Sequence, residues 1–183
     1  MTTEIPIGSQ GVDDDVVRSF ARDWAAAWNS HDPERVVAMM APNCQYNDTA
    51  WSTTMRTHDE VREFLRHTWR ALPDLEFYDV TISRVPGEPK AIFHWHARAT
   101  MRGALDPPGY APTLDHLEFD GFDMHEYRDG KLVRLRILFN MMDVGQQIGA
   151  VPPPRSLRER AVVFLHRLQA PGRRRANAKR SGT

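Results

Sequence analysis

The chain has very little cysteine: Cys44 stands alone among 183 residues. A single thiol excludes a disulfide within the chain and a thiolate metal cluster, because both need several cysteines. A lone cysteine is most often an inert part of the core, and we expect that of Cys44.

Apolar runs are also missing at the start of the chain. Residues 1–15 read MTTEIPIGSQGVDDD, which is polar and acidic. A signal peptide or a membrane anchor needs an apolar segment there, so neither is predicted. We therefore expect a cytoplasmic protein, and its 183 residues suffice for one domain with one core.

The net charge is zero as well, but positive and negative residues are distributed unevenly along the chain. Residues 155–183 hold nine Lys or Arg against one Glu, a net charge of +8, and residues 1–154 hold 15 basic against 23 acidic residues, a net charge of −8. A basic segment attracts polyphosphates and acidic lipids, so nucleic acid and an anionic membrane are both candidate partners. Docking of this segment onto the acidic body explains the composition equally well.

Three helices are predicted in the first 73 residues. The first follows the acidic run at residues 13–15 and ends near Ser30. The second is short, residues 34–40, with Asp32-Pro33 as its N-terminal signal. The third begins at the capping box of residues 57–60. The first and third carry apolar residues three and four positions apart, typical of helices that bury one face.

After residue 73 the apolar period changes from helical to two, which predicts strands. The expected strands cover roughly residues 76–84, 91–102, 116–127 and 132–142. Helices followed by strands indicate an α+β fold, and the short connections favour an antiparallel sheet.

The expected organisation has four parts. Residues 1–12 are a flexible N-terminus, and residues 13–150 are the folded domain. Residues 151–155 are a stiff Pro-rich linker, because proline fixes the backbone angle φ. Residues 156–183 comprise a basic amphipathic helix up to Ala170 and a disordered Arg-rich tail.

The last two predicted strands form a hairpin whose outgoing strand is rich in carboxylates. Asp129-Gly130 is a strong turn signal. A two-residue turn there would leave Asp123 and His125 outside the apolar face. A turn at residues 128–129 followed by a glycine bulge would instead point both side chains inward. Periodicity leaves the two registers open.

A family resemblance decides between them. The chain resembles the nuclear transport factor 2-like superfamily over about residues 14–149, and within it the SnoaL-like polyketide cyclases and the ketosteroid isomerases. The residues that carry the likeness are the segments 24–29 (WAAAWN), 31–32 (HD), 43–48 (NCQYND), 73–75 (PDL), 122–124 (FDM), 129–131 (DGK) and 146–149 (QQIG). The resemblance implies a cone of three N-terminal helices laid over a strongly curved antiparallel sheet, with a ligand pocket between them, and frequent dimers.

The resemblance also implies two catalytic carboxyls. The general base of the isomerases falls on Asp48, expected to stay ionised, and their protonated, hydrogen-bond-donating aspartic acid falls on Asp123. We therefore choose the register that buries Asp123. The isomerase tyrosine falls on Trp24, whose indole donates a hydrogen bond but is no acid, and one residue of the cyclase pair falls on Ile137, which moves no protons.

Aromatic and apolar side chains are predicted to line a pocket for a hydrophobic small molecule. The predicted substrate-binding residues are Trp24, Tyr46, Trp51, Trp95, Phe119, His125, Leu135, Ile137 and Phe139. Trp28 and Trp69 are assigned to core packing, and Asp143 is a reserve acid.

Neither a metal nor a cofactor is predicted. His94 and His96 lie on one strand face at a spacing that can bind a metal. That face is opposite the aromatic one, however, and no carboxylate is placed to complete the ligand set.

The leading functional hypothesis is acid and base catalysis on an enolisable hydrophobic carbonyl compound, by isomerisation or cyclisation. A non-catalytic ligand-binding or dimeric interaction module is the alternative, because fold does not imply function. An epoxide hydrolase ranks last, because the arginine it needs would be Arg98, whose strand parity places it outside.

Overall fold

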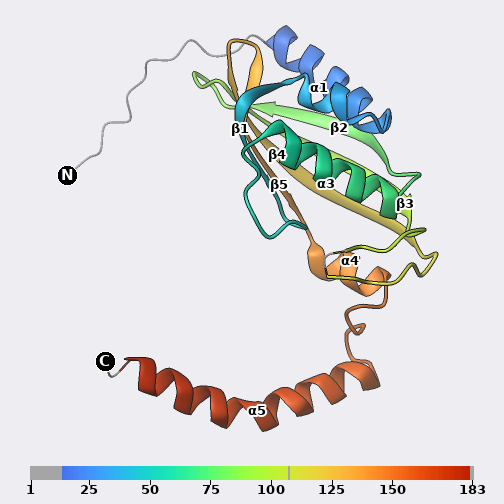
Figure 1. The fold of residues 1–183 in the computed structure, drawn as a ribbon, viewed down its shortest axis with the longest axis vertical. Coiled ribbons are helices and arrows are strands. Elements are labelled where there is room, and N and C mark those ends of the chain that lie inside the picture. Colours follow the sequence, from blue (N-terminus) through green and yellow to red (C-terminus); the bar gives the residue numbers. More distant parts are fainter. Residues whose placement is uncertain (1–13, 107, 182–183) are drawn as a thin grey trace. The chain divides into compact units, whose positions relative to one another are not determined.

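The computed structural model describes residues 14–106 and 108–181 (Figure 1). The segment expected to be a flexible N-terminus, residues 1–12, lies outside these. The chain divides into two compact units, the first ending at Ile148 and the second starting at Gly149.

The first unit begins with three helices, α1 (Asp14–Asn29), α2 (Pro33–Val37) and α3 (His58–Ala71). Asp32 caps α2 by accepting a hydrogen bond from the Glu34 backbone N–H, and Thr57 with Glu60 forms the predicted capping box of α3. The prediction of α1 and α3 is therefore confirmed. The second helix is shorter than predicted, because the chain enters a strand at residue 40.

Five strands form one sheet: β1 (Met40–Asp48), which lies between α2 and α3 in the chain, and β2 (Glu76–Arg84), β3 (Lys90–Thr100), β4 (His116–Arg128) and β5 (Lys131–Phe139) after α3. Their spatial order is β1-β5-β4-β3-β2. Strand β1 was not predicted, and its pairing with β5 is parallel, so the prediction of a purely antiparallel sheet is wrong for this pair. The α+β class with a curved sheet under three N-terminal helices is confirmed.

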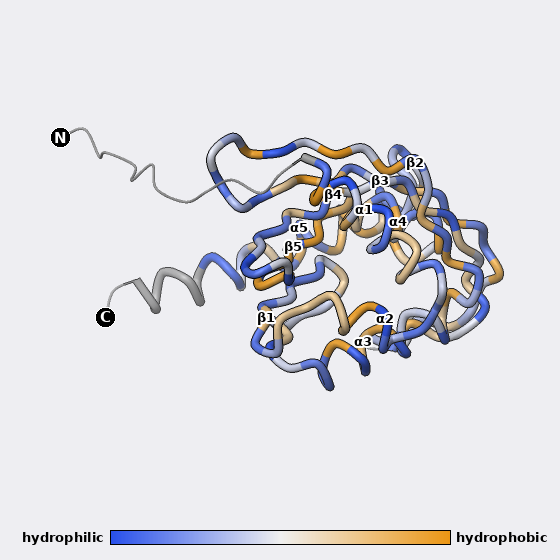
Figure 2. Tube along the Cα trace, turned by 90° about the horizontal axis from the view of Figure 1, so that it is seen from above, coloured by the Kyte–Doolittle hydropathy of each residue, from blue (hydrophilic) through white to orange (hydrophobic). Residues whose placement is uncertain are grey.

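The sheet has one buried and one more exposed face. Along β3, Phe93 and Trp95 are buried, whereas His94 and His96 between them are half-buried. Figure 2 colours the chain by hydropathy, and hydrophobic and hydrophilic residues follow one another closely along the sheet. The buried face packs against the helices, where the ring of Trp28 in α1 meets that of Trp69 in α3 at 5.7 Å.

The β4–β5 hairpin combines features of both predicted registers. Asp129 and Gly130 have φ angles of 51° and 70°, which is a two-residue turn. Tyr127 pairs with Leu132, but Glu126 pairs with Arg134, so one residue of β5 bulges out. The bulge shifts the register of β5, so that Leu132 before it and Leu135 and Ile137 after it all lie on the buried face.

Along β4, Asp123 and His125 lie on the same buried face as Tyr127 and are 3% and 2% exposed, whereas Phe122 on the other face is 45% exposed. The predicted inward orientation of both residues is confirmed. The chosen register places Asp123 opposite Leu135 and His125 opposite Val133. That pairing is wrong in detail, because Asp123 lies opposite Ile137 and His125 opposite Leu135.

A short helix, α4 (Met141–Gln147), closes the first unit. Asn140 caps it by accepting hydrogen bonds from the backbone N–H groups of Met142 and Asp143. The predicted last strand therefore ends at Phe139 rather than at residue 142. Gln147 ties α4 to β4 by accepting from the backbone N–H of Glu118 at 2.9 Å.

The second unit contains the helix α5 (Leu157–Ser181). It was expected to end at Ala170 but continues past Pro171 to Ser181. Among the described helices, none combines the length and the hydropathy needed to cross a bilayer.

Candidate active site

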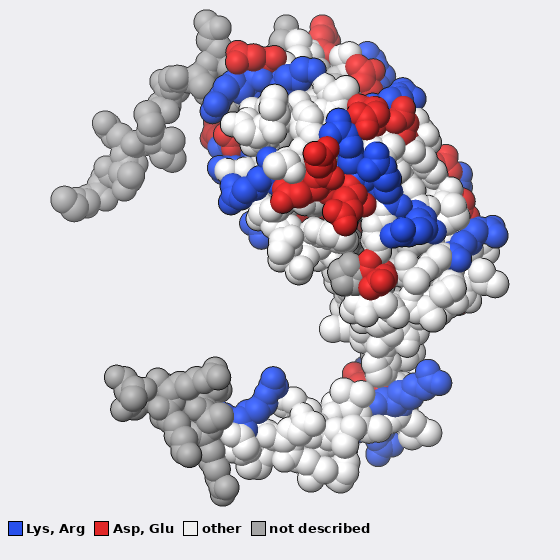
Figure 3. Space-filling view, viewed as in Figure 1, with Lys and Arg blue, Asp and Glu red and all other residues white. Residues whose placement is uncertain are grey.

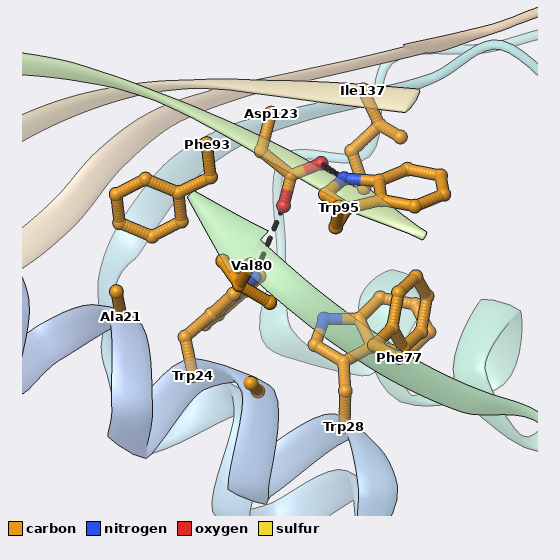
Figure 4. A pocket seen from close by; sticks show the side chains of 10 residues that line it. Ala21, Trp24, Trp28, Phe77, Val80, Phe93, Trp95, Asp123 and Ile137 are labelled. Carbon is orange, nitrogen blue, oxygen red and sulfur yellow. Dashed lines mark hydrogen bonds between the residues drawn. The ribbon is translucent and has the colours of Figure 1, made fainter. Parts of the chain in front are cut away.

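A small cavity lies between α1 and the buried face of the sheet (Figure 4). Its volume is about 20 Å³, room for about one water molecule. Asp123 is the one charged residue among those that line it. The lining residues are Ala21, Trp24, Ala25, Trp28, Phe77, Val80, Phe93, Trp95, Asp123 and Ile137.

The carboxyl group of Asp123 is held by two indoles from different elements. Trp95 of β3 donates its Nε1–H to Oδ1 at 2.7 Å, and Trp24 of α1 donates its Nε1–H to Oδ2 at 3.1 Å. Figure 4 shows both bonds converging on the carboxyl group. Each oxygen of the Asp123 carboxyl group therefore accepts a hydrogen bond from an indole N–H.

A chain of polar groups continues from Asp123 along the same face of β4. The ring nitrogen Nε2 of His125 lies 3.3 Å from Oδ2 of Asp123, and Nδ1 lies 3.0 Å from the hydroxyl of Tyr127. In the tautomer with a proton on Nε2, His125 donates to Asp123 and accepts from Tyr127. Burial, with the negative charge of Asp123 nearby, raises the pKa of Tyr127, so its hydroxyl stays protonated.

The position of Trp95 depends on a glycine of the neighbouring strand. Gly121 pairs with Trp95 across β3 and β4. A Cβ atom at residue 121 would lie 2.5 Å from the Trp95 ring and 2.8 Å from the backbone oxygen of Leu138. The indole therefore occupies the space of the missing side chain and reaches Asp123 from there.

Asp48 lies on the same sheet face as Asp123, with one residue between them. In the pairing across the sheet, Ile137 of β5 is opposite both Asp48 of β1 and Asp123 of β4. The side chain of Ile137 lines the cavity, whereas Asp48 is not among the lining residues. The two carboxyls thus flank Ile137 on the inner face of the sheet.

The surroundings of Asp48 raise the pKa of its carboxyl group. Burial raises the pKa of the Asp48 carboxyl to about 7, with a further rise from the negative charge of Asp123 and a partial offset from the Ala50 N–H at 2.7 Å. Near neutral pH the carboxyl is therefore divided between its two protonation states. It was expected to stay ionised, and burial is the reason for the difference.

We expect replacement of Asp48 by Asn to stabilise the protein at high pH. The folded pKa of about 7 lies above the unfolded value near 3.8, so the stability of the wild type falls as pH rises between these values. Asn does not ionise and escapes this loss. At pH 8 the unfolding free energy of Asp48→Asn should exceed that of the wild type by about 2 kcal/mol, less than the full shift implies because the half-buried carboxyl is partly hydrated.

Urea unfolding of both proteins at low and high pH measures this difference. The exposed residue Asp115 supplies a control with the same charge change. Asp115→Asn should follow the wild type at both pH values. A constant difference between Asp48→Asn and the wild type at every pH would contradict a raised pKa.

Tyr46 adds an unused hydrogen-bond donor to this region. The residue is fully buried, and its hydroxyl has no hydrogen-bond partner among the described residues. Burial and the negative charges of Asp48 and Asp123 raise its pKa well above the usual value, so the hydroxyl keeps its proton. Tyr46 and Asp48 are two residues apart on one strand and share its inner face.

The structure brings together only part of the predicted substrate-binding set. Trp24, Trp95 and Ile137 of this set line the cavity beside the predicted catalytic residue Asp123, whereas the other predicted substrate-binding residues do not. Phe119 and Phe139 pack behind Trp95 with ring centroids 5.9 and 6.3 Å away. The predicted residues outside the lining are Tyr46, Trp51, Phe119, His125, Leu135 and Phe139.

Two further predicted residues, Trp51 and Asp143, contact other parts of the fold and not the cavity. Trp51 packs edge-on against Phe64 of α3, with centroids 5.4 Å apart. Asp143, the reserve acid, lies in the first turn of α4 and accepts a hydrogen bond from Gln147 at 2.9 Å. Neither lines the cavity.

Several lining residues were missed, among them Trp28, Phe77 and Val80. Trp28 was assigned to the core, although its place on α1 one turn after Trp24 is a signal that both face the same side. Phe77 and Val80 lie on β2, where the pairing with β3 is irregular between Tyr78 and Thr81. That irregularity lets Phe77 and Val80 face the same side despite their odd spacing.

The cysteine and the histidines of β3 were the remaining candidates for a nucleophile or a metal ligand. Burial raises the pKa of the Cys44 thiol to about 12, so it stays protonated and unreactive. His94 is paired with Asp120 at 3.2 Å on the outer face. Among the residues that the structure describes, no group of three or more His, Cys, Asp and Glu side chains is arranged to hold a metal ion.

The chain was compared with known families, curated proteins and solved structures. A search of curated proteins found no significant match. AclR, a putative hydroxylase from Streptomyces galilaeus, is 21% identical with a TM-score of 0.63, over 74% of this chain and 96% of that one. A putative SnoaL-like polyketide cyclase from Jannaschia sp. CCS1 is 17% identical with a TM-score of 0.64, over 83% of this chain and 100% of that one.

A protein with a ketosteroid isomerase-like fold from Catenulispora acidiphila, in complex with trimethylamine, is 17% identical with a TM-score of 0.60, over 77% of this chain and 96% of that one. At these identities the likeness shows a shared fold, and it confirms the fold that the sequence resemblance implies. The model of the SnoaL-like polyketide cyclase family matches residues 18–148, which is most of the sequence. The chain therefore belongs to the SnoaL-like polyketide cyclase family.

Proposed function

We propose that the protein is a cofactor-independent acid and base enzyme that acts on a hydrophobic, enolisable carbonyl compound. The observation that carries this proposal is Asp48, an inward carboxyl whose pKa burial raises to about 7. A group that is half protonated near neutral pH both accepts and donates a proton with little driving force in either direction. Asp48 is thus the group that moves a proton between two carbon positions of the substrate.

The neighbours of Asp48 supply the other roles. The unpartnered hydroxyl of Tyr46 donates a hydrogen bond to the carbonyl oxygen, where negative charge develops in an enolate. Asp123, fixed by Trp24 and Trp95, accepts a hydrogen bond from a hydroxyl or enol group of the substrate and orients it. The negative charge of Asp123 also helps to raise the pKa of Asp48. Asp123 therefore acts in this proposal as an acceptor rather than as the protonated acid.

Substrate binding requires side chains to move. A cavity of about 20 Å³ does not hold a ring system. Ile137 lies between the cavity and Asp48, and Trp24 with Trp95 forms much of the remaining wall. Displacement of Ile137 by the substrate would join the cavity to Asp48 in one site.

Deuterium incorporation tests the proton transfer without knowledge of the natural substrate. Wild type is incubated in D₂O with a panel of hydrophobic cyclic ketones, β-diketones and steroid enones, and exchange at the carbon next to the carbonyl is followed by NMR. We expect exchange with a rate that changes with pH around 7, where Asp48 titrates. Asp48→Asn should lower the rate by at least about 100-fold.

Tyr46→Phe and Asp115→Asn complete the set. Tyr46→Phe removes the proposed donor and should slow exchange while leaving the pH dependence in place. Asp115→Asn removes an exposed carboxyl and should leave the rate unchanged. Equal rates for wild type and Asp48→Asn would remove Asp48 from the mechanism.

A non-catalytic binding module is the second candidate, and the aromatic lining of the cavity favours it. Trp24, Trp28 and Trp95 offer apolar ring surface to a ligand but no acid or base. This candidate predicts that hydrophobic ligands quench the tryptophan fluorescence equally in wild type and in Asp48→Asn, without deuterium exchange in either. An epoxide hydrolase receives no support, because Arg98 is 63% exposed at its side chain and paired with Glu76 on the outer face.

A further inference from the structure

The helix α5 carries an exposed apolar face. Leu157, Phe164 and Leu168 are 79%, 60% and 63% exposed, and Leu165 is 55% exposed. Together with Ala161 they follow spacings of three and four residues, which places them on one side of a helix. Large side chains of this kind are seldom left in water along a whole helix face.

Arginines flank this apolar face. Arg160, Arg167 and Arg174 recur every seven residues and follow one border of it, while Arg158 lies at the other border. Over Leu157–Ser181 the sequence holds eight Lys or Arg and one Glu, a net charge of +7. Figure 3 shows the blue basic side chains of the described part of α5 beside uncoloured ones.

We propose that α5 is an interfacial helix that binds the surface of an anionic phospholipid bilayer. Leu157, Phe164 and Leu168 enter the boundary between headgroups and acyl chains. The arginines at the borders extend their charged ends to the lipid phosphates, as long basic side chains do at membrane surfaces. The helix lies along the surface, and its charge is complementary to that of the lipids.

Two features together favour a membrane over other anionic partners. Nucleic acid would use the arginines but would leave Phe164, Leu165 and Leu168 in water. Only a partner that is negatively charged and apolar within a few ångströms uses both halves of the helix, and a bilayer interface has this composition. The Pro-rich segment at residues 152–154 precedes α5 and joins it to the folded domain.

Vesicle co-sedimentation of the full chain tests the assignment. Vesicles of phosphatidylcholine alone are compared with vesicles that contain about 30% phosphatidylglycerol, at low salt, where charge attraction is least screened. We expect the bound fraction at limiting lipid to be at least about tenfold higher with the anionic lipid. Arg160→Glu combined with Arg167→Glu should lower this binding by at least roughly tenfold.

A matched pair of variants separates the apolar face from the rest of the helix. Phe164→Asp changes the apolar face, and Val162→Asp changes a residue of similar exposure on the opposite side. Phe164→Asp should weaken binding roughly tenfold and Val162→Asp no more than about twofold. Helix content by circular dichroism is checked for each.

Three results would overturn the assignment. Equal binding to both vesicle types would show that lipid charge is not recognised. If the arginine variant loses binding and Phe164→Asp binds as the wild type does, the contact depends on charge alone, as with a polyphosphate. Absence of vesicle binding together with a lowered melting temperature of Phe164→Asp would show that the face packs on protein.

Discussion

Replacement of Asp123 by Asn should lower the unfolding free energy by about 3 kcal/mol. Trp24 and Trp95 each donate an indole N–H to one oxygen of the Asp123 carboxyl group. An amide has one oxygen and one NH₂ group, so one indole would face another donor in a site that water barely reaches. The hydrogen bond of His125 to Asp123 would also be weakened. Urea unfolding measures the loss, and the melting temperature should fall by roughly 6–12 °C.

Asp120→Asn is the control for this prediction. Asp120 lies on the same strand but on the outer face, where its side chain is 58% exposed beside His94. The same chemical change there should cost no more than about 0.5 kcal/mol. Similar losses for the two variants would show that the indoles do not hold the Asp123 carboxyl in the way that the structure shows.

Replacement of Gly121 by Ala should cost about 3 kcal/mol or more of stability and displace Trp95. The added methyl group would lie 2.5 Å from the Trp95 ring and 2.8 Å from a backbone oxygen of β5, well inside contact distance. Because Trp95 also forms the shorter of the two indole bonds to Asp123, its displacement should break that bond. We expect a shift of the tryptophan emission and a lowered melting temperature from one methyl group.

A double-mutant cycle with Trp95→Phe checks the cause. Phenylalanine lacks the part of the indole that overlaps the site of the new methyl group. Gly121→Ala should therefore cost at least about 1 kcal/mol less in Trp95→Phe than in the wild type. The rest of the cost, from the backbone oxygen of Leu138, should remain in both backgrounds. Full additivity would contradict a steric conflict between residue 121 and the Trp95 ring.

Local signals in the sequence predict much of the fold. The capping box at Thr57 and Glu60 locates the start of α3, and the apolar period locates α1 and four strands. The inward position of Asp123 and His125 was also predicted, although only with the help of the family resemblance. The helices and strands depend on residues within one or two turns of each other, which is why the sequence alone reveals them, whereas the hairpin register does not.

The missed features depend on distant partners. β1 contains Pro42 and four polar residues out of nine, and its strand conformation comes from pairing with β5 far along the chain. The bulge in β5 follows from how the whole inner face packs, and nothing in the turn at Asp129-Gly130 announces it. For the same reason the raised pKa of Asp48 was not predicted, because the burial that causes it depends on this pairing.

The parallel pairing of β1 with β5 affects the order in which a newly synthesised chain folds. Asp48 lies opposite Ile137. During synthesis β1 is therefore complete long before its partner, because nearly three times as many residues must be made to reach Ile137 as to reach Asp48. Until then the backbone groups of β1 that pair with β5 lack these partners, and unpaired strand edges favour aggregation. Contacts between such distant residues form slowly, because a long loop must close first. The carboxyl of Asp48 is thus among the last groups to reach its place in a newly made chain.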